Sequence, residues 1–402
     1  MLLGVDVGGT FTDAVLATGD QIFTAKAPTT AHDQSEGVLR AVDAVLEKAG
    51  VTAASLTSFS HGTTVATNAL LEGRTARAAL IATEGFTDLV ELARQNRAEL
   101  YRLCAPGPAP LVPPELRFPA PERMTPEGPL RDLSEAAARE LAERVAAAGV
   151  DAVAVVLLHA YRHPEHELLL GRALEERAPH ISRHLSHQSV GTFREYERAA
   201  TTEVDAALSP LLSGYLRRLA GRCREAALPA PAIMQSAGGL IDLDQAAGHP
   251  ALTVLSGPAG GAAGAAFAAR AAGCPDVLCF DMGGTSCDVC VVDGGKVQEQ
   301  SWGQIGTHPP RPLAVPMLAI HTVGAGGGSV AWRDPGGALR VGPRSAGADP
   351  GPACYGRGGS EPTVTDANLV LGHLDPAVPL AGGVRLDAEA AHAAVAGLAR
   401  TI

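Results

Sequence analysis

The alternation of apolar and polar positions predicts strands and helices that follow one another along the whole chain. Strands are expected where short apolar runs end at turn residues, and helices where apolar residues recur every three or four positions. Such alternation is typical of an α/β protein. The expected elements are strands at 2–5, 21–25, 80–83, 152–158 and 233–235, and helices at 33–49, 134–148, 164–178, 194–208, 210–227, 257–272 and 387–400.

Proline sets two further expectations. Residues 105–129 contain so many prolines that neither a helix nor a central strand should persist, so this stretch is expected to be irregular. Pro210 is expected to divide the long helical pattern after residue 194 into two helices.

One short pattern occurs twice between apolar runs. It is Asp-x-Gly-Gly-Thr-x-x-Asp, at residues 6–13 and again at residues 281–288. A Gly-Gly pair between two apolar runs predicts a β-hairpin whose turn needs a positive φ or a close approach of the backbone. An ordinary glycine-rich hairpin is the alternative for either copy alone, but two copies in the same strand context favour a shared function.

The residue types in this turn suit a nucleotide and its metal ion. Successive backbone amides around glycines form a concavity for anions, and the threonine hydroxyl adds a donor for a phosphate oxygen. The aspartate at the strand end adds a carboxylate, and Mg²⁺ is typically held by one or two carboxylates, waters and the phosphates themselves. The two copies therefore predict a two-domain clamp for a nucleotide.

Longer motifs give the chain a resemblance to a known family. The duplicated turn resembles the phosphate hairpins of the actin, Hsp70 and sugar-kinase superfamily of ATPases. Further stretches narrow the resemblance to the A-type chain of the hydantoinase/oxoprolinase family. These stretches lie at residues 61–70, 194–198, 234–239, 256–261, 321–329, 345–352 and 361–368.

The resemblance implies an α/β fold of two ribonuclease-H-like lobes with a nucleotide cleft between them. The lobes are expected at residues 1–180 and 190–402, the second being C-terminally incomplete relative to the family. The implied function is that of an ATP-dependent hydrolase, which opens a cyclic amide of the hydantoin or 5-oxoproline type through a phosphorylated intermediate. An ATP-dependent ketone carboxylase subunit and a non-catalytic nucleotide-binding assembly subunit are the alternatives.

The resemblance also implies roles for the two turns. Asp6 and Asp281 are expected to hold Mg²⁺ and to take part in catalysis. Asp13 and Asp288 are expected to orient a water or to cap the hairpin backbone. The residues expected to contact ATP are Gly8, Gly9, Thr10, Thr12, Gly283, Gly284, Thr285, Gly324, Gly326 and Gly327.

Two histidines are candidates for substrate binding or proton transfer. His61 is expected where a loop meets a helix N-terminus, and capping of that helix by Thr63 or Thr64 is the alternative. His321 precedes the glycine-rich stretch 323–329, for which a flexible loop is the alternative. A second anion site is expected where the glycines at 257–261 open a helix, unless these small residues serve only close packing.

Composition narrows the partners. A formal net charge of −11 without a basic cluster argues against nucleic acid or an anionic membrane as the main partner. Seven scattered cysteines and the lack of an apolar run that could span a bilayer indicate a cytoplasmic protein with reduced thiols. A cyclic amide or ketone substrate and a B-type subunit are the expected partners, and a homo-oligomer is also open. Ala319 stands where members of the family often carry an acidic residue.

Overall fold

The computed structural model describes residues 1–8, 11–30, 33–96, 101–102, 109–306, 310–347, 349–380 and 384–402. These residues form two compact units, each assembled from separate stretches of the chain. The first unit contains residues 1–4, 52–256 and 299–317, and the second contains residues 5–51, 257–298 and 318–402. The lobes expected at 1–180 and 190–402 stay a prediction.

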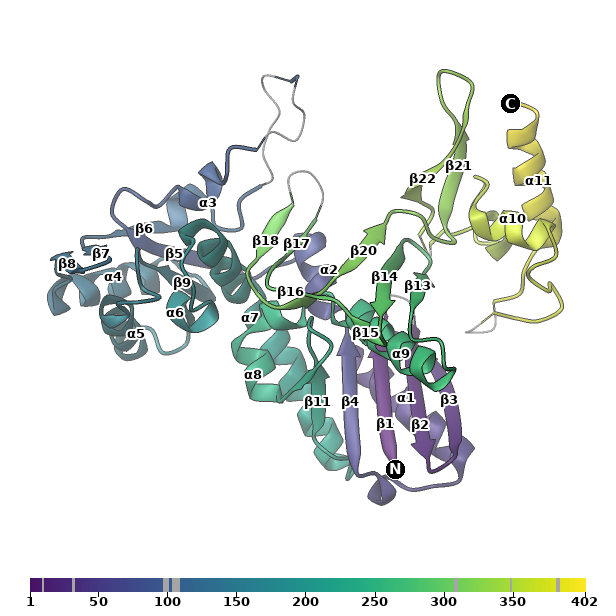
Figure 1. Cartoon of the computed structure of the whole chain (residues 1–402), viewed down its shortest axis with the longest axis horizontal. Coiled ribbons are helices and arrows are strands. Elements are labelled where there is room, and N and C mark those ends of the chain that lie inside the picture. Colours follow the sequence, from purple (N-terminus) through teal and green to yellow (C-terminus); the bar gives the residue numbers. More distant parts are fainter. Residues whose placement is uncertain are drawn as a thin grey trace. The chain divides into compact units, whose positions relative to one another are not determined.

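A four-stranded parallel sheet forms the main core of the first unit (Figure 1). Its strands, in sheet order, are β10 (Ser182–Leu185), β9 (Ala152–Val156), β5 (Ala78–Thr83) and β6 (Arg117–Ala120). Every side chain of β5 and β9 is buried, which is typical of strands covered on both faces. The helices packed on this sheet are α4 (Glu135–Ala147), α5 (Glu165–Arg177) and α7 (Glu195–Glu225).

Shorter elements complete the first unit. Strand β11 (Pro231–Met234) pairs in parallel with β4 (Ser58–Thr63) and antiparallel with β12 (Leu240–Ile241). The other helices are α2 (Val65–Leu71), α3 (Leu89–Leu92), α6 (Ser186–Ser189) and α8 (Leu243–Gly248). The other strands are β7 (Arg123–Thr125), β8 (Gly128–Arg131), β16 (Glu299–Gln300), β17 (Gly303–Ile305) and β18 (Arg311–Leu313), while β19 (Met317–Leu318) ends in the second unit.

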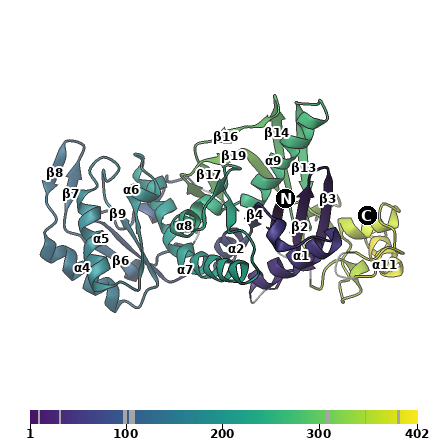
Figure 2. The same ribbon diagram turned by 90° about the horizontal axis from the view of Figure 1, so that it is seen from below.

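The second unit begins with an antiparallel meander. Strand β1 (Leu2–Val7) runs into it from the first unit and is followed by β2 (Phe11–Thr18) and β3 (Gln21–Pro28). Helix α1 (Gln34–Ala49) packs on β2 and β3, as Figures 1 and 2 show. Its ends are those that the sequence predicts, because the Asp33 side chain accepts from the Ser35 amide and Gly50 ends the helix at φ 65°.

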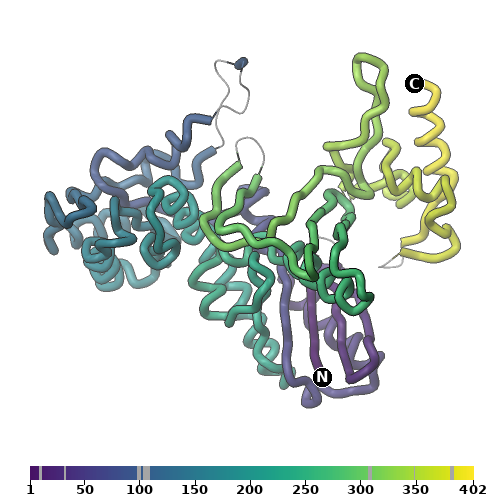
Figure 3. Tube along the Cα trace, viewed as in Figure 1, coloured from purple at the N-terminus to yellow at the C-terminus, as the bar shows by residue number. Residues whose placement is uncertain are grey.

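The second copy of the repeated pattern forms another antiparallel sheet in the same unit. It contains β13 (Val277–Met282), β14 (Cys287–Asp293), β15 (Lys296–Val297) and β20 (Ile320–Val323). Figure 3 shows this green stretch of the chain close to the purple strands of the first copy. The remaining elements are α9 (Ser256–Ala271), β21 (Ser329–Arg333), β22 (Leu339–Ser345), α10 (Val364–Val370) and α11 (Ala388–Ala399).

The long helix α7 corrects one expectation. It continues through Pro210 as a single helix, whereas the sequence predicted two. Proline removes one backbone hydrogen bond from a helix interior, which costs about 3 kcal/mol. The helix is buried continuously from Arg198 to Ser209 and again at every third or fourth residue after the proline, so tertiary packing outweighs that cost.

The proline-rich stretch 105–129 was also predicted wrongly in part. Residues 109–129 contain β6, β7 and the start of β8, although an irregular segment was expected. Pro119 lies within β6, which is the edge strand of its sheet. Proline is tolerated there because an edge strand does not need every backbone N–H for pairing.

The motif at residues 194–198 contributes a buried cation to the first unit. Arg198 is fully buried, and its guanidinium donates to Ser186 Oγ at 3.0 Å and to the carbonyls of Thr192 at 3.0 Å and Leu157 at 2.9 Å. Burial lowers the pKa of Arg198. These bonds tie the start of α7 to the end of β9, so the arginine has a structural role.

None of the helices in the described ranges combines the length and the apolar character that crossing a membrane requires.

A buried carboxyl group in α7 predicts a pH-dependent stability. Glu203 is 1% exposed, and its Oε2 has no hydrogen-bond partner among the described residues. Burial raises the pKa of Glu203 from 4.5 to about 7, although Arg311 and Arg117 oppose the shift. Between about pH 4.5 and pH 7, the folded protein keeps this proton, whereas the unfolded chain has already lost it. The free energy of unfolding therefore falls as the pH rises from 4.5 to 7.

We expect Glu203→Gln to raise the free energy of unfolding by about 2–3 kcal/mol at pH 8, and by close to nothing near pH 4.5. Chemical denaturation at both pH values measures this difference. Glu225→Gln, at the exposed end of the same helix, is the matched control and should change neither value. An equal gain at both pH values would show that Glu203 does not titrate in this way.

Candidate active site

The first repeated pattern folds as the predicted hairpin between β1 and β2. The Gly8 amide donates to the Phe11 carbonyl at 2.9 Å and closes the turn. The Gly8 carbonyl accepts from Thr29 Oγ1 at 2.9 Å, and Thr29 Oγ1 lies 3.1 Å from Thr12 Oγ1. Thr12 is therefore buried beneath the turn. Gly9 and Thr10 lie outside the described residues.

The second copy forms the same turn between β13 and β14. The Gly283 amide donates to the Ser286 carbonyl at 2.9 Å, which repeats the Gly8 bond at the equivalent position. Gly283, Gly284 and Thr285 are exposed. The closing bond is thus repeated in the structure, and the prediction of two hairpins is confirmed.

Two carboxylates from the two hairpins lie within electrostatic range of each other. Asp6 and Asp281 both remain exposed to solvent and belong to the second unit. Protein atoms around Asp6 partly desolvate its carboxylate and raise its pKa, and the charges of Asp13 and Asp281 raise that pKa further. Among the described residues, no hydrogen bond or ion pair is made to the side chain of Asp6 or of Asp281. The two turns therefore present uncompensated negative charge to the same solvent region.

A glycine-rich loop braces the second turn. The Gly327 amide donates to the Gly283 carbonyl at 2.9 Å, and the Gly328 amide donates to the Gly284 carbonyl at 2.6 Å. The Gly327 carbonyl in turn accepts from both the amide and Oγ1 of Thr365, each at 2.8 Å. The flexible loop considered from the sequence is therefore wrong for this stretch, because backbone bonds hold it against the turn.

Two of the glycines expected to contact phosphate, Gly326 and Gly327, make hydrogen bonds within the protein. The Gly326 amide donates to Ser329 Oγ at 2.8 Å, and the Gly327 amide is bound to Gly283. Both amides are therefore already occupied by protein acceptors. Gly324 is exposed, so a phosphate contact through this loop stays a prediction.

The outer aspartate of each pattern is paired across its sheet. Asp13 lies opposite Lys26 on β3, and the carboxylate is 3.0 Å from Lys26 Nζ. Asp288 lies opposite Thr322 on β20 and accepts from Thr322 Oγ1 at 2.6 Å. Both contacts join side chains of neighbouring strands, and neither is made to the hairpin backbone. The catalytic role of both aspartates stays a prediction.

The two candidate histidines lie in different units. His61 is in β4 of the first unit, is fully buried, and its Nε2 lies 2.7 Å from Tyr215 Oη. The loop position expected for His61 is wrong, because the strand continues to Thr63, whose Oγ1 accepts from the Val65 amide at the start of α2. His321 is exposed on β20 of the second unit, opposite Val289. A role in catalysis for either histidine stays a prediction.

The glycines at 257–261 open a helix, as expected, because they form the first turns of α9, which begins at Ser256. An anion site at this helix start stays a prediction. The small size of these glycines has a local use. A Cβ atom placed on Gly261 would lie 3.4 Å from Asp281 Oδ2, so this part of α9 runs beside that carboxylate.

One residue that supports the site, Asp366, was not among the residues predicted from the sequence. Asp366 is fully buried and accepts from the amides of Thr363 and Cys354 at 2.9 and 2.8 Å and from Thr363 Oγ1 at 2.7 Å. This capping box fixes the start of α10 and with it Thr365, which holds Gly327. The spacing Thr-x-x-Asp before an apolar run was the available signal.

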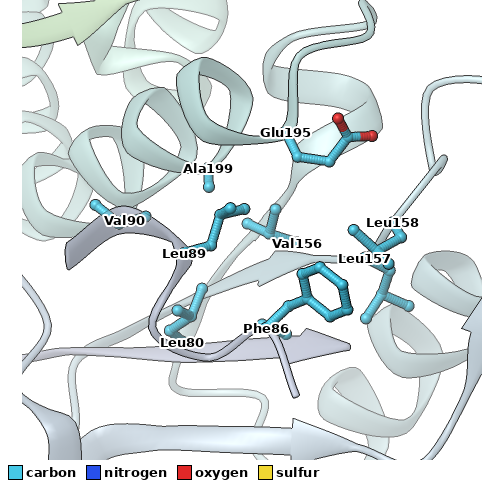
Figure 4. Close-up of a pocket in the computed structure, with 10 residues that line it drawn as sticks. Leu80, Phe86, Leu89, Val90, Val156, Leu157, Leu158, Glu195 and Ala199 are labelled. Carbon is cyan, nitrogen blue, oxygen red and sulfur yellow. The ribbon is translucent and has the colours of Figure 1, made fainter. Parts of the chain in front are cut away.

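A small apolar pocket lies at the carboxyl ends of β5 and β9 in the first unit (Figure 4). Phe86, Leu89 and Val156 line it, and Glu195 is the charged group among its described lining residues. Ligands often bind at this edge of a parallel sheet. The cavity volume is only about 10 Å³, which is room for about one water molecule, so it is too small for a cyclic amide.

The carboxylates of Asp6 and Asp281 suit a cation whose remaining ligands come from a bound molecule and from water. Within the described ranges, no group of three or more His, Cys, Asp or Glu side chains could ligate a metal ion. Mg²⁺ needs only one or two carboxylates when waters and phosphates complete its shell. Two exposed, uncompensated carboxylates beside glycine turns match that requirement.

Comparison with known proteins identifies the family. Residues 198–402 match the hydantoinase/oxoprolinase family, and residues 2–178 match the N-terminal region of the same family. The chain belongs to the hydantoinase/oxoprolinase family. The resemblance inferred from the motifs is thereby confirmed.

The relatives of this chain include a caprolactamase subunit and a 5-oxoprolinase. The caprolactamase subunit alpha of Pseudomonas jessenii is 36% identical over 400 residues, which cover 97% of this chain and 57% of that subunit. The 5-oxoprolinase 1 of Arabidopsis thaliana is 34% identical over 409 residues, which cover 92% of this chain and 31% of that enzyme. This chain therefore spans less than two thirds of the length of these relatives.

Solved structures of this family share the fold. The ATP-dependent caprolactamase from Pseudomonas jessenii superposes with a TM-score of 0.84 at 35% identity, over 98% of this chain and 58% of that one. Nucleotide-free acetone carboxylase superposes with a TM-score of 0.81 at 26% identity, over 99% of this chain and 58% of that one. The predicted fold class, α/β of the actin-like ATPase type, is confirmed.

The contact between the glycine-rich loop and the second turn can be tested at Gly326. A Cβ at this position would lie 2.7 Å from backbone atoms of Gly284 and Thr285, so alanine must push the loop away from the turn. We expect Gly326→Ala to lower the free energy of unfolding by about 2 kcal/mol and to speed amide exchange in residues 283–285.

Gly324→Ala in the same loop is the control, because its new Cβ would find Pro343 Cβ at an ordinary 3.6 Å. Hydrogen exchange with mass spectrometry and chemical denaturation measure both variants. Equal effects at the two positions would mean that the loop does not brace the turn.

Proposed function

We propose that this chain is the nucleotide-binding part of an ATP-dependent enzyme that opens a small cyclic amide. One observation carries the proposal: two turns of the same geometry belong to one unit, and the carboxylate of each lies within electrostatic range of the other. Such turns supply amide donors for phosphate oxygens, while the carboxylates supply ligands for the accompanying cation.

The residues of the two turns have complementary roles in this proposal. Asp6 and Asp281 would hold Mg²⁺, which neutralises phosphate charge when it is bound. Gly8, Gly283 and Gly284, with Gly9, Thr10 and Thr285, would orient the triphosphate. The bonds from the Gly327 and Gly328 amides keep the second turn in one conformation, so that its donors need little reorganisation.

The chemical need for ATP follows from the stability of the amide. An unstrained cyclic amide resists water because resonance stabilises its C–N bond. Transfer of the γ-phosphoryl group breaks its bond to ADP and forms a bond to the amide carbonyl oxygen. Water then adds at the carbonyl carbon, and the C–N bond opens as the nitrogen takes up a proton, which leaves an acyl phosphate. A second water attacks the same carbon and forms the carboxylate, and phosphate departs with the former carbonyl oxygen. ATP is consumed as a co-substrate.

The cyclic amide is favoured by similarity to the caprolactamase and 5-oxoprolinase relatives. The second candidate is an ATP-dependent ketone carboxylase subunit, supported by the likeness to acetone carboxylase. Because the caprolactamase relative is described as a subunit, we also propose that this chain acts with a B-type subunit of the same family. ADP release with hydantoins, 5-oxoproline, lactams or ketones with bicarbonate, in the presence of that subunit, distinguishes the two candidates.

The assignment of the carboxylates predicts the effect of neutralising them. We expect Asp6→Asn and Asp281→Asn each to lower substrate-stimulated ATP hydrolysis by about 100-fold or more, because each removes a charge that faces the phosphates. Both carboxylates are exposed, so the fold should remain. Steady-state ADP release and circular dichroism measure the two effects.

Asp20→Asn, at the exposed turn between β2 and β3, is the control and should leave ATP hydrolysis unchanged. Full activity in Asp6→Asn would contradict the proposal. So would an absence of ATP hydrolysis in the unaltered protein assembled with its partner, which would favour the non-catalytic assembly subunit.

A further inference from the structure

Two cysteines face each other across the second hairpin. Cys279 on β13 is the direct partner of Cys290 on β14 in the antiparallel register. Directly opposite residues of antiparallel strands have Cα atoms about 4.5–5.5 Å apart, and a disulfide joins residues whose Cα atoms are about 4.4–6.8 Å apart. The backbone of the hairpin therefore holds the two cysteines at a separation that a disulfide can span.

The side chains of the two cysteines are also in contact. Opposite residues of an antiparallel pair project from the same face of the sheet, and a hydrogen bond joins the thiols of Cys279 and Cys290. Both are free thiols in the structure. Cys290 is 4% exposed, whereas Cys279 is only partly buried. A small reagent can therefore reach Cys279, and Cys290 lies in contact with it on the inner side.

The cysteine pair lies next to the aspartate pair of the same hairpin. Asp281 and Asp288 are opposite each other, two positions further along each strand, so they share the face of the cysteines. Opposite Cβ atoms are about 4.5–5.5 Å apart, whereas a disulfide brings them to about 3.5–4.5 Å. A bond between the cysteines would therefore draw the strands together beside Asp281.

We propose that Cys279 and Cys290 form a redox-sensitive modification site, in which a peroxide converts the two thiols reversibly into a cross-strand disulfide that restrains the second hairpin. Disulfides in proteins that otherwise keep reduced thiols are usually transient and serve catalysis or redox sensing. The proposal does not depend on the substrate or on ATP hydrolysis.

The reaction begins at Cys279. Burial and the neighbouring Cys279 raise the pKa of Cys290 to about 11, which keeps Cys290 protonated at neutral pH. Cys279 Sγ attacks one peroxide oxygen and the O–O bond breaks. The thiol proton leaves with the departing oxygen, as water when the oxidant is hydrogen peroxide, and Cys279 becomes a sulfenic acid.

The second step forms the disulfide. Cys290 Sγ attacks Cys279 Sγ, the S–O bond breaks, and the Cys290 proton leaves with the departing hydroxide as water. Two electrons pass from the thiols to the peroxide over both steps, so the reaction balances. Exchange with an external thiol breaks the disulfide and restores both cysteines.

The test treats the chain with hydrogen peroxide and maps its peptides by mass spectrometry without reductant. We expect a peptide pair linked through Cys279 and Cys290 as the main disulfide product, and its loss on addition of dithiothreitol. Hydrogen exchange of the amides in β13 and β14 should become about 10-fold slower after oxidation, because a covalent bond that closes a short loop restricts its opening.

Two variants remove the pair from opposite sides. Cys279→Ser, at the partly exposed position, should abolish both the linked peptide and the slower exchange. Cys290→Ala should abolish the link and leave the sulfenic acid of Cys279 to be trapped by dimedone. Circular dichroism shows whether each variant is folded, and the Cys279 variant keeps the test decisive if the buried position does not tolerate alanine.

Cys274→Ser is the matched control. Cys274 is exposed and precedes β13, so its replacement should change neither the linked peptide nor the exchange rates. Absence of the Cys279–Cys290 link after oxidation would overturn the proposal, as would a link that forms only between two molecules. A linked hairpin whose amides exchange as fast as before would overturn the claim that the bond restrains it.

Discussion

The candidate site in the second unit depends on two like charges at the ends of two strands. Asp6 and Asp281 come from distant parts of the sequence, yet the fold brings them into electrostatic range, where Asp281 contributes to the raised pKa of Asp6. Both side chains stay open to solvent. Carboxylates in this arrangement are stabilised by a cation, and the neighbouring turns add donors for an anion. A nucleotide with its metal ion supplies both.

The two copies of the repeat have diverged around this shared feature. Each turn is closed by the same 2.9 Å bond, at Gly8 and at Gly283, but a threonine hydroxyl holds the first and a glycine-rich loop holds the second. The bond that closes the turn is therefore repeated, and the structural support is not.

Local signals in the sequence predicted the parts of the fold that local interactions determine. The hairpins and the limits of α1 follow from turn residues and capping side chains. Tertiary packing decided the rest. Packing keeps α7 helical on both sides of Pro210, and the topology of the sheet puts Pro119 on an edge strand. The braces formed by Thr29 and Thr365 could not be predicted, because each joins residues far apart in sequence.

The central claim, that the two acidic turns converge in one unit, is tested most directly by a double-mutant cycle on Asp6 and Asp281. The free energy of unfolding is measured at pH 8 and low salt, without nucleotide or divalent cation, for the unaltered protein, Asp6→Asn, Asp281→Asn and the double variant. The account predicts that the double variant gains less stability than the sum of the single gains, by about 0.5–1 kcal/mol, and that added salt reduces this difference. Additivity within about 0.3 kcal/mol at low salt would contradict it.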